Sequence, residues 1–469
     1  MNTKALRQKI LDLAIHGKLV PQDPNDEPAS VLLERIKAEK ERLIKEGKIK
    51  RTKRSKAACD KPHYPYELPE GWCWTKVGEI SKSILYGVSE SAKSKGEYKL
   101  LRITDIQNNA VDWNTVPYTD YDEHRANAYR ISDGDILFAR TGATVGKSYL
   151  VKGLQDKAIY ASYLIRVQTF NEILPEYVKY FFESGFYWEQ IQKDSVGIGQ
   201  PNVNGTTLSQ LALPIPPINE QHRIVNELGS WLNIIDAIDN GKTELQIAIK
   251  RTKSKILALA IHGKLVPQDP SDEPANELLK RINPKAEITC DNPQYGKLPN
   301  GWCETLLGNI GTWQSGATPS RLRKEYYGGS IPWLKTGDLN DGIVQFIPEC
   351  ITERALEETS VKLNPAGSIL IAMYGATIGR IGILSKPATT NQACCACVDY
   401  LPEKKFLFYF LLANRENFIA MGGGGAQPNI SKEKIIHTHI PLPPQQEQHR
   451  IVAKIEELFT QLDKIEASL

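Results

Sequence analysis

The feature that most constrains this chain is an internal duplication. The string ILDLAIHGKLVPQDP at 10–24 recurs as ILALAIHGKLVPQDP at 256–270, and the string DEPA follows it both times. Four further strings recur in the same order: 68–73 with 298–303, 142–147 with 375–380, 200–202 with 427–429, and 220–225 with 447–452. Repeats of this kind predict two homologous halves that share one topology.

Length and composition agree with a folded chain of two domains. The 469 residues exceed what one hydrophobic core usually serves, and a content of 41% apolar and 24% charged residues is typical of globular proteins. The richest apolar run, 406–413, is too short to span a bilayer. Eight cysteines without disulfide-framework spacing suit a reducing compartment, so we expect a cytoplasmic protein.

A basic insertion distinguishes the first half. About sixteen extra residues separate its shared strings (246 − 230 between the repeat offsets), and residues 37–61 hold eleven Lys/Arg against four Asp/Glu. Such a run is either a solvated helix face or tether, or a strap that contacts phosphates. Composition alone does not decide between these two interpretations.

Apolar residues at heptad spacing predict one long helix over 220–262. One heptad position holds Leu228, Ile235, Ile249 and Ile256, and the other includes Trp231. A break at 239–241 is the alternative to a continuous helix. The C-terminal segment repeats the first part of this pattern and the N-terminal segment repeats the last part. The predicted seam and subunit-docking residues are Leu228, Trp231, Ile235, Ile249, Ile256, Ile455, Leu458 and Leu462.

The two chain ends together predict a second long helix. Residue 469 corresponds to 242 (469 − 227) and residue 1 to 247 (1 + 246), so only about four residues are missing between them. The two helices are then expected to pack antiparallel as a coiled coil, in a circular pseudo-two-fold arrangement. The alternative is that each helix packs on its own domain.

Short mixed segments separated by Gly and Pro turns predict α+β domains. Strands are expected at 98–103, 135–139, 164–167, 331–335 and 368–372, and a helix at 174–182. The expected organisation is an N-terminal helical region with a basic linker over 1–64, a first domain over 65–217, a central helical spacer over 218–290, a second domain over 291–444, and a C-terminal helix over 445–469.

Motifs for catalysis or metal binding fail on inspection. Residues 141–148 resemble a phosphate-binding Walker A loop, but Thr141 stands where the loop needs its first glycine, and the counterpart at 374–381 lacks the Lys-Ser pair. What the two turns share is glycine followed by a cation, Lys147 or Arg380, which suits either a phosphate contact or a structural hairpin. The CxxC at 394–397 has no second pair at zinc spacing, so a buried strand is favoured.

The architecture resembles the DNA-specificity (S) subunit of type I restriction-modification systems over essentially the whole chain. The resemblance is carried by the repeated GKLVPQ and EQHRIV strings, and in the second domain by 316–320, 331–338 and 375–379. The first domain departs from this pattern, because it has Arg102-Ile103-Thr104-Asp105 where the second has Lys335-Thr336-Gly337-Asp338.

The resemblance implies a non-catalytic subunit with two target-recognition domains, one for each half of a bipartite, asymmetric site in double-stranded DNA. It also implies two modification (methyltransferase) subunits and restriction (endonuclease/translocase) subunits as partners, with no membrane. We expect no cofactor in this chain, since S-adenosylmethionine, ATP and Mg would belong to the partner subunits.

Between the shared strings the halves differ freely, as at 83–89 against 312–318, and differing loops suit different half-sites. The expected DNA contacts are Lys95, Arg102, Thr104, Gln107, Arg140, Lys147, Gln200 and Asn202 in the first domain, and Ser320, Arg321, Lys335, Thr336, Arg380, Gln427 and Asn429 in the second. Two alternatives stay open: a helical scaffold or interaction protein with incidental DNA contact, and a nucleotide-dependent enzyme.

Overall fold

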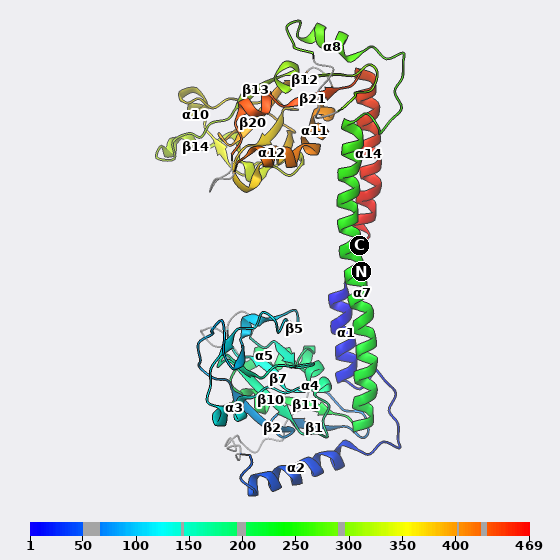
Figure 1. Cartoon of the computed structure of the whole chain (residues 1–469), viewed down its shortest axis with the longest axis vertical. Helices are drawn as coiled ribbons and strands as arrows, with labels where there is room; N and C mark the ends of the chain where they lie inside the picture. The colour runs from blue at the N-terminus through cyan, green and yellow to red at the C-terminus, as the bar shows by residue number, and fades with distance from the viewer. Residues whose placement is uncertain (50–65, 142–144, 195–202, 289–295, 401–402, 424–428) are drawn as a thin grey trace. The chain divides into compact units, whose positions relative to one another are not determined.

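The computed structural model divides the chain into two compact units, Met1–Gly241 and Lys242–Leu469 (Figure 1). It describes residues 1–49, 66–141, 145–194, 203–288, 296–400, 403–423 and 429–469. Each unit combines strands and helices around its own core, as the α+β prediction required.

The first unit contains three main sheets. One pairs β1 (Cys73–Lys76) with β11 (Ala212–Ile215), and a four-stranded sheet has the order β2 (Ser81–Tyr86), β10 (Leu164–Thr169), β7 (Ile136–Ala139), β8 (Ser148–Leu150). A third has the order β6 (Tyr118–Thr119), β3 (Tyr98–Leu101), β9 (Ala158–Tyr160), and a small hairpin joins β4 (Ile106–Gln107) to β5 (Ala110–Val111). The helices between them are α3 (Glu123–Tyr129), α4 (Pro175–Phe181), α5 (Gly185–Asp194) and α6 (Gly205–Gln210).

The second unit repeats this plan. It pairs β12 (Cys303–Leu306) with β21 (His439–Leu442), and orders a larger sheet β13 (Gly311–Ser315), β20 (Cys394–Tyr400), β17 (Ile369–Ala372), β18 (Ile381–Leu384), β15 (Gly342–Val344). Its third sheet has the order β16 (Cys350–Ile351), β14 (Tyr327–Leu334), β19 (Thr389–Thr390). The helices are α8 (Ala275–Ile282), α9 (Leu307–Ile310), α10 (Glu353–Glu358), α11 (Lys404–Ala413), α12 (Arg415–Met421) and α13 (Lys432–Ile436).

The pairing pattern confirms the duplication at the level of topology. In each unit an antiparallel pair joins the first strand of the domain to its last, and the third sheet contains one parallel pair, β3 with β9 or β14 with β19. The strands that the sequence predicted at 98–103, 135–139, 331–335 and 368–372 are β3, β7, part of β14 and β17. The same frame therefore carries two different sets of loops.

The predicted long helix is α7 (Ile218–Ile261), which continues through Asp239, Asn240 and Gly241 without a break. In the first unit, α1 (Thr3–Ile15) lies along the part of α7 before Gly241 (Figure 1). Arg7 pairs with Asp236 and Arg223 pairs with Asp26, so α1 and the segment that follows it run antiparallel to α7. The apolar seam here includes Leu228 and Ile235, both fully buried.

In the second unit, α14 (Gln445–Ala467) lies along the later part of α7 (Figure 1). Lys253 pairs with Asp463 at 2.5 Å, while Gln268, beyond the end of α7, bonds to Glu447 near the start of α14, so these helices are antiparallel. Five predicted seam residues of this unit pack in its core: Ile249, Ile256 and Ile455 are buried, and Leu458 and Leu462 are partly buried.

Trp231 departs from the predicted seam, because its side chain is 40% exposed and its indole N–H donates to Glu227. The buried side chains of this part of α7 are Leu228 and Ile235, which share one heptad position, and Ile224, which shares the heptad position of Trp231 but lies nearer the start of the helix. A single neighbouring helix covers one row of side chains well and leaves the adjoining row at its rim. Closure of the two terminal helices into one second helix stays a prediction, because it depends on how the units are placed.

The basic insertion begins as α2 (Ala29–Lys45), which buries Leu32 and Ile36. Some of its charges are paired locally, since Arg42 contacts Glu39 and Glu46 and Lys48 contacts Glu46. Residues 50–65 of the basic run lie outside the described residues. The described part of the insertion therefore supports a solvated helix face.

The predicted buried strand with the CxxC string is β20, in which Cys394, Cys395 and Cys397 are buried. Burial raises the pKa of the Cys395 and Cys397 thiols to about 12. The described residues contain no group of three or more His, Cys, Asp or Glu arranged to hold a metal ion. None of the described helices is both long and apolar enough to cross a membrane.

Candidate nucleic-acid interface

Three loops converge at the same edge of each domain, held by equivalent backbone hydrogen bonds. The ends of β3 and β9 are joined by Ala161 N–H to the Leu101 carbonyl (2.9 Å), and in the second domain Asn391 N–H donates to Leu334 at the same distance. The residue after β7 continues the series: Arg140 N–H donates to the Tyr163 carbonyl, and the Arg140 carbonyl accepts from Val203 N–H.

The second domain repeats this series at Met373, whose N–H donates to Ala393 and whose carbonyl accepts from Ile430 at 2.9 Å. The loops that follow β3, β7 and β9 are thus brought to one edge together with the segment around 203 or 430. The residues at these equivalent positions differ between the domains: Arg140 and the exposed Tyr163 in one, and the buried Met373 and Ala393 in the other. To read two different half-sites, two domains with the same backbone arrangement need different side chains at their DNA-facing loops.

The glycine turns that resembled phosphate loops are the tight connections of the β7–β8 and β17–β18 hairpins. Gly146 and Gly379 have φ of 87° and 77°, and a Cβ there would lie 2.5 Å from the Trp188 ring or 3.0 Å from the Arg415 side chain. Glycine is therefore needed both for the left-handed backbone and for the close approach of the following helix. Lys147 and Arg380 come directly after these glycines and are exposed at the surface.

A second shared turn follows β3 and β14. Arg102 N–H donates to Asp105 Oδ2 and Lys335 N–H donates to Asp338 Oδ2, both at 2.8 Å, so each turn is closed by its own aspartate. The Arg102 guanidinium also makes an ion pair with Asp105 at 2.7 Å, and the hydrogen bond that it donates to this aspartate raises the pKa of Arg102. Thr104 and Gln107 lie exposed on the same turn and hairpin, and Thr336 begins the turn in the second domain.

A tyrosine ring lies against Arg140 in the first domain. The Arg140 guanidinium lies 4.8 Å from the centre of the Tyr86 ring, and the Tyr86 hydroxyl accepts a hydrogen bond from Gly205 N–H at 2.7 Å. Tyr86 and the neighbouring Tyr163 are both exposed, Tyr163 by 59%. Exposed aromatic rings beside a basic group can stack on bases or contact sugar and phosphate.

The remaining predicted contacts are placed as follows. Lys95 is exposed in the segment before β3, and Ser320 and Arg321 are exposed in the segment between β13 and β14. Asn429 lies beside the glycine turn of the second domain, since it forms a β-bridge with Tyr374. Three predicted residues, Gln200, Asn202 and Gln427, lie outside the described residues.

The sequence did not reveal Tyr86, Tyr163, Tyr374 or Glu349 at this edge. Tyr374 is 43% exposed in the second domain, and Glu349 makes ion pairs with both Arg321 and Lys335. A usable signal was present for one of them, because Tyr374 directly precedes the matched string at 375–380. The sequence patterns favoured Arg, Lys, Asn, Gln and hydroxyl side chains at the interface, whereas aromatic rings and a carboxylate also lie there.

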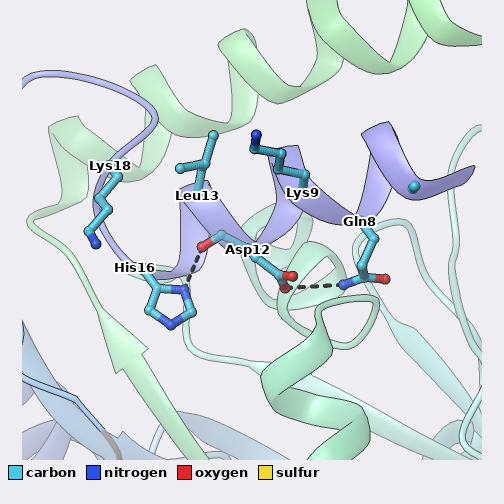
Figure 2. Close-up of a pocket in the computed structure, with 7 residues that line it drawn as sticks. Gln8, Lys9, Asp12, Leu13, His16 and Lys18 are labelled. Carbon is cyan, nitrogen blue, oxygen red and sulfur yellow. Dashed lines mark hydrogen bonds between the residues drawn. The ribbon is translucent and has the colours of Figure 1, made fainter. Parts of the chain in front are cut away.

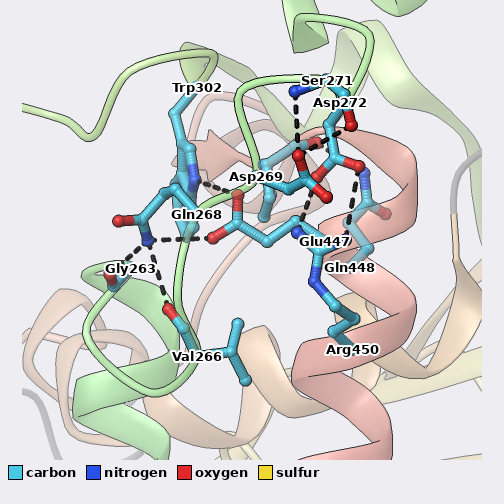
Figure 3. Close-up of polar contacts among 11 residues, drawn as sticks. Gly263, Val266, Gln268, Asp269, Ser271, Asp272, Trp302, Glu447, Gln448 and Arg450 are labelled. Atoms are coloured by element: carbon cyan, nitrogen blue, oxygen red, sulfur yellow. Dashed lines mark hydrogen bonds and ion pairs between the residues drawn. The ribbon is translucent and has the colours of Figure 1, made fainter.

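The strings with the strongest repetition form a buried polar network where each domain meets its helix. Glu447, 1% exposed, accepts hydrogen bonds from Trp302 Nε1 (2.9 Å) and Gln268 Nε2 (3.1 Å), and Gln268 also donates to the Gly263 carbonyl at 2.7 Å (Figure 3). Beside it Arg450 pairs with Asp272 at 2.6 Å. Burial raises the pKa of Glu447.

The first unit contains the same network with nearly the same distances. Glu220 accepts from Trp72 at 3.0 Å and from Gln22 at 3.1 Å, and Arg223 pairs with Asp26 at 2.7 Å. Burial likewise raises the pKa of Glu220. The GKLVPQDP, LPxGW and EQHRIV strings thus recur because their side chains bond to one another and set the junction between domain and helix.

A second repeated surface lies on the helices themselves. Figure 2 shows a pocket on α1 lined by Gln8, Lys9, Asp12, Leu13, His16 and Lys18. Four of these recur in the second unit as Lys255, Leu259, His262 and Lys264. In both copies the lysines are exposed, the leucine and histidine are half-buried, and the histidine Nδ1 bonds to the carbonyl four residues earlier. We call these two sets of four residues the outer patches.

Comparison with known proteins decides the family. The sequence model described as type I restriction modification DNA specificity domain matches residues 69–247 and 299–469. The chain belongs to this family. It is a DNA-specificity protein of the type I restriction-modification kind, and the matched ranges coincide with the duplicated halves.

Relatives cover nearly the whole chain. It is 28% identical over 542 residues to the EcoAI specificity subunit of Escherichia coli (98% of this chain, 90% of the relative) and 26% identical over 557 residues to the EcoEI specificity subunit of the same species (99% and 90%). A solved chain from a study of complex assembly and conformational transition of the type I R-M system is 20% identical with a TM-score of 0.64, covering 86% of this chain and 94% of that one. That structure supports the fold.

Proposed function

We propose that this subunit reads a bipartite, asymmetric DNA site with one half-site per domain, and that it is itself non-catalytic. The observation that carries this proposal is the repeated edge, where equivalent backbone bonds bring equivalent loops together while the side chains differ between the domains. S-adenosylmethionine, ATP and Mg would then act in partner subunits. The scaffold and nucleotide-enzyme alternatives find no comparable support among the described residues.

Within this proposal Lys147 and Arg380 contact the DNA backbone, one in each domain. Both are exposed directly after a glycine with positive φ at the loop edge, and lysine or arginine beside backbone N–H groups suits phosphate. A phosphate contact fixes the position of the protein on the duplex and carries no sequence information by itself. Base contacts would come from the side chains that differ between the domains.

Methylome sequencing of cells that express this chain with its modification and restriction subunits tests the proposal. The expected result is one two-part methylated motif with a fixed gap.

Lys147→Ala and Arg380→Ala should each weaken binding to all duplexes and reduce the slope of log affinity against log salt by about one. Lys280→Ala, on the exposed helix α8, is the matched control. A palindromic or single-part motif, or no DNA binding by the assembled complex, contradicts the proposal.

We further propose that the outer patches bind two modification subunits. The halves have diverged at most exposed positions, yet Lys9, Leu13, His16 and Lys18 recur at the equivalent surface positions of the second unit. A surface kept twice suits a partner that is present twice. Lys18→Glu should leave one modification subunit bound, Lys264→Glu likewise, and the double variant none, as measured by native mass spectrometry. Full occupancy of the double variant would refute this assignment.

A further inference from the structure

One carboxylate in the second domain holds two cations at the loop edge. Lys335 Nζ lies 2.7 Å from Glu349 Oε2, and the Arg321 guanidinium donates to Glu349 Oε1. The glutamate is the least exposed of the three, with 23% of its side chain accessible against 54% for Arg321 and 43% for Lys335. We call these residues the Glu349 cluster. The less exposed glutamate holds both cations, and each cation keeps about half of its side chain open to solvent.

Two aromatic rings fix the arginine further. The Arg321 guanidinium lies 4.4 Å from the centre of the Tyr327 ring and 5.1 Å from that of the buried Trp333. Both rings are themselves held, because the Tyr327 hydroxyl donates to the Pro319 carbonyl and Trp333 Nε1 donates to Ala317 at 3.1 Å. An arginine held by a carboxylate and by ring faces loses little side-chain entropy when it binds a ligand.

The side chains around the cluster are of the kinds that contact base edges in a DNA groove. The two most exposed large apolar side chains among the described residues are Leu322 (95%) and Phe346 (77%), and they lie on the two segments that supply Arg321 and Glu349. Apolar contacts with thymine methyl groups and arginine or lysine bonds to guanine are the usual partners in direct readout. Figure 1 shows β14, which leads into Lys335, at the edge of the second unit away from α14.

The carboxylate changes what two cations can recognise. Without it, Arg321 and Lys335 would form a doubly positive patch that binds any phosphate backbone. With it, the cluster has a net charge of +1, and the glutamate repels phosphates that approach between the cations. The remaining N–H groups can still donate to base edges, where guanine presents O6 and N7 as acceptors. The hydrogen bond from Arg321 lowers the pKa of Glu349, so the carboxylate stays ionised at neutral pH.

We infer that Glu349 is a specificity-determining positioning residue of the second domain, which directs Arg321 and Lys335 toward base edges and against phosphates. This inference rests on the proposed reading of one half-site per domain. The first domain has no equivalent three-residue arrangement among its described residues, since Arg102 pairs with Asp105 of its own turn. The effect of Glu349 is therefore confined to one half of the DNA site.

The test uses the complex of this chain with its modification subunits and selects bound duplexes from two libraries, each randomised in one half-site. For Glu349→Gln, the base preference in the half-site read by the second domain should weaken at one or more positions, while the other half-site is selected as by the wild type. Binding to a non-cognate duplex should become more salt-dependent, with a slope steeper by about 0.9 for one added phosphate contact. Arg321→Lys, which keeps the charge and loses the planar stacked group, should weaken preference at overlapping positions.

Glu277→Gln is the matched control, because it removes one carboxylate from an exposed ion pair with Lys280 on α8. Unchanged selection by Glu349→Gln in both half-sites overturns the inference, and so does a change in the first half-site. Loss of binding to every duplex by a variant with the wild-type circular dichroism spectrum also overturns it, since Glu349 would then support affinity and not selectivity. Failure of the wild-type complex to select any two-part site would instead refute the proposed function.

Discussion

The buried network around Glu447 predicts an unusually large effect for a mild substitution. Trp302→Phe keeps most of the aromatic packing and removes only the indole N–H that donates to Glu447 at 2.9 Å. The acceptor is 1% exposed and has Gln268 as its other side-chain donor, so the carboxylate would be left with half of its hydrogen bonds. Hydrogen bonds to charged groups contribute about 1.5–3 kcal/mol to stability, and this is the expected cost where Glu447 is ionised.

The assay is thermal unfolding followed by circular dichroism. For a domain of 150–250 residues each kcal/mol shifts Tm by about 2–4 °C, so the transition of the second unit should fall by about 3–12 °C. Trp313→Phe is the matched control in the same unit, because its indole is 8% exposed and donates at 3.0 Å to the neutral carbonyl of Leu307. A neutral hydrogen bond contributes about 0.5–1.5 kcal/mol. Trp72→Phe should reproduce the larger effect in the first unit.

A double-mutant cycle separates the hydrogen bond from lost packing. If Trp302 acts through the carboxylate, Trp302→Phe should cost clearly less in a Glu447→Gln background, with a coupling energy of at least about 0.5 kcal/mol. If Trp302→Phe destabilises no more than Trp313→Phe, or if the cycle shows no coupling, then the network does not stabilise the junction as argued.

Three further predictions concern the helices and junctions. Ile235→Asp places a charge at a fully buried seam position and should abolish the cooperative melting of the first unit, whereas the same change at the 45% exposed Ile465 should be mild. Gly263→Ala should lower the free energy of unfolding by about 2 kcal/mol or more, because φ is +65° and the new Cβ would lie 2.4 Å from a proline ring. Gly153 has φ of +67° but open space around it, so Gly153→Ala should lower the free energy of unfolding by about 1 kcal/mol. Urea unfolding measures both. Burial raises the folded-state pKa of Glu447, so the folded state binds more protons than the unfolded state. The stability that protonated Glu447 contributes is therefore lost as pH rises through that raised pKa. In urea titrations from acid to neutral pH, Glu447→Gln should remove this part of the decrease in the free energy of unfolding.

Local patterns predicted the framework because they follow from periodicity along the chain. Heptad spacing over 220–262 predicted a helix that spans Ile218–Ile261, and the matched strings predicted two domains whose strands pair in the same order. Matching the Arg102 string with the Lys335 string by sequence paired two turns that the structure closes in the same way, each by its own aspartate. Trp231 was wrong as a buried seam residue, since heptad position alone does not say which row the neighbouring helix covers.

The sequence by itself determined that there are two copies of one fold, where their shared junctions lie, and that the loops between them differ. Only the tertiary structure decided which side chains work together: Glu349 is 28 residues from Arg321, and Trp302 is 145 residues from Glu447. Neither pair shares a helical or strand period, so no pattern along the chain links them. Pairing across a sheet or a domain junction brings such groups within hydrogen-bond distance, and that geometry exists only after the whole domain has folded.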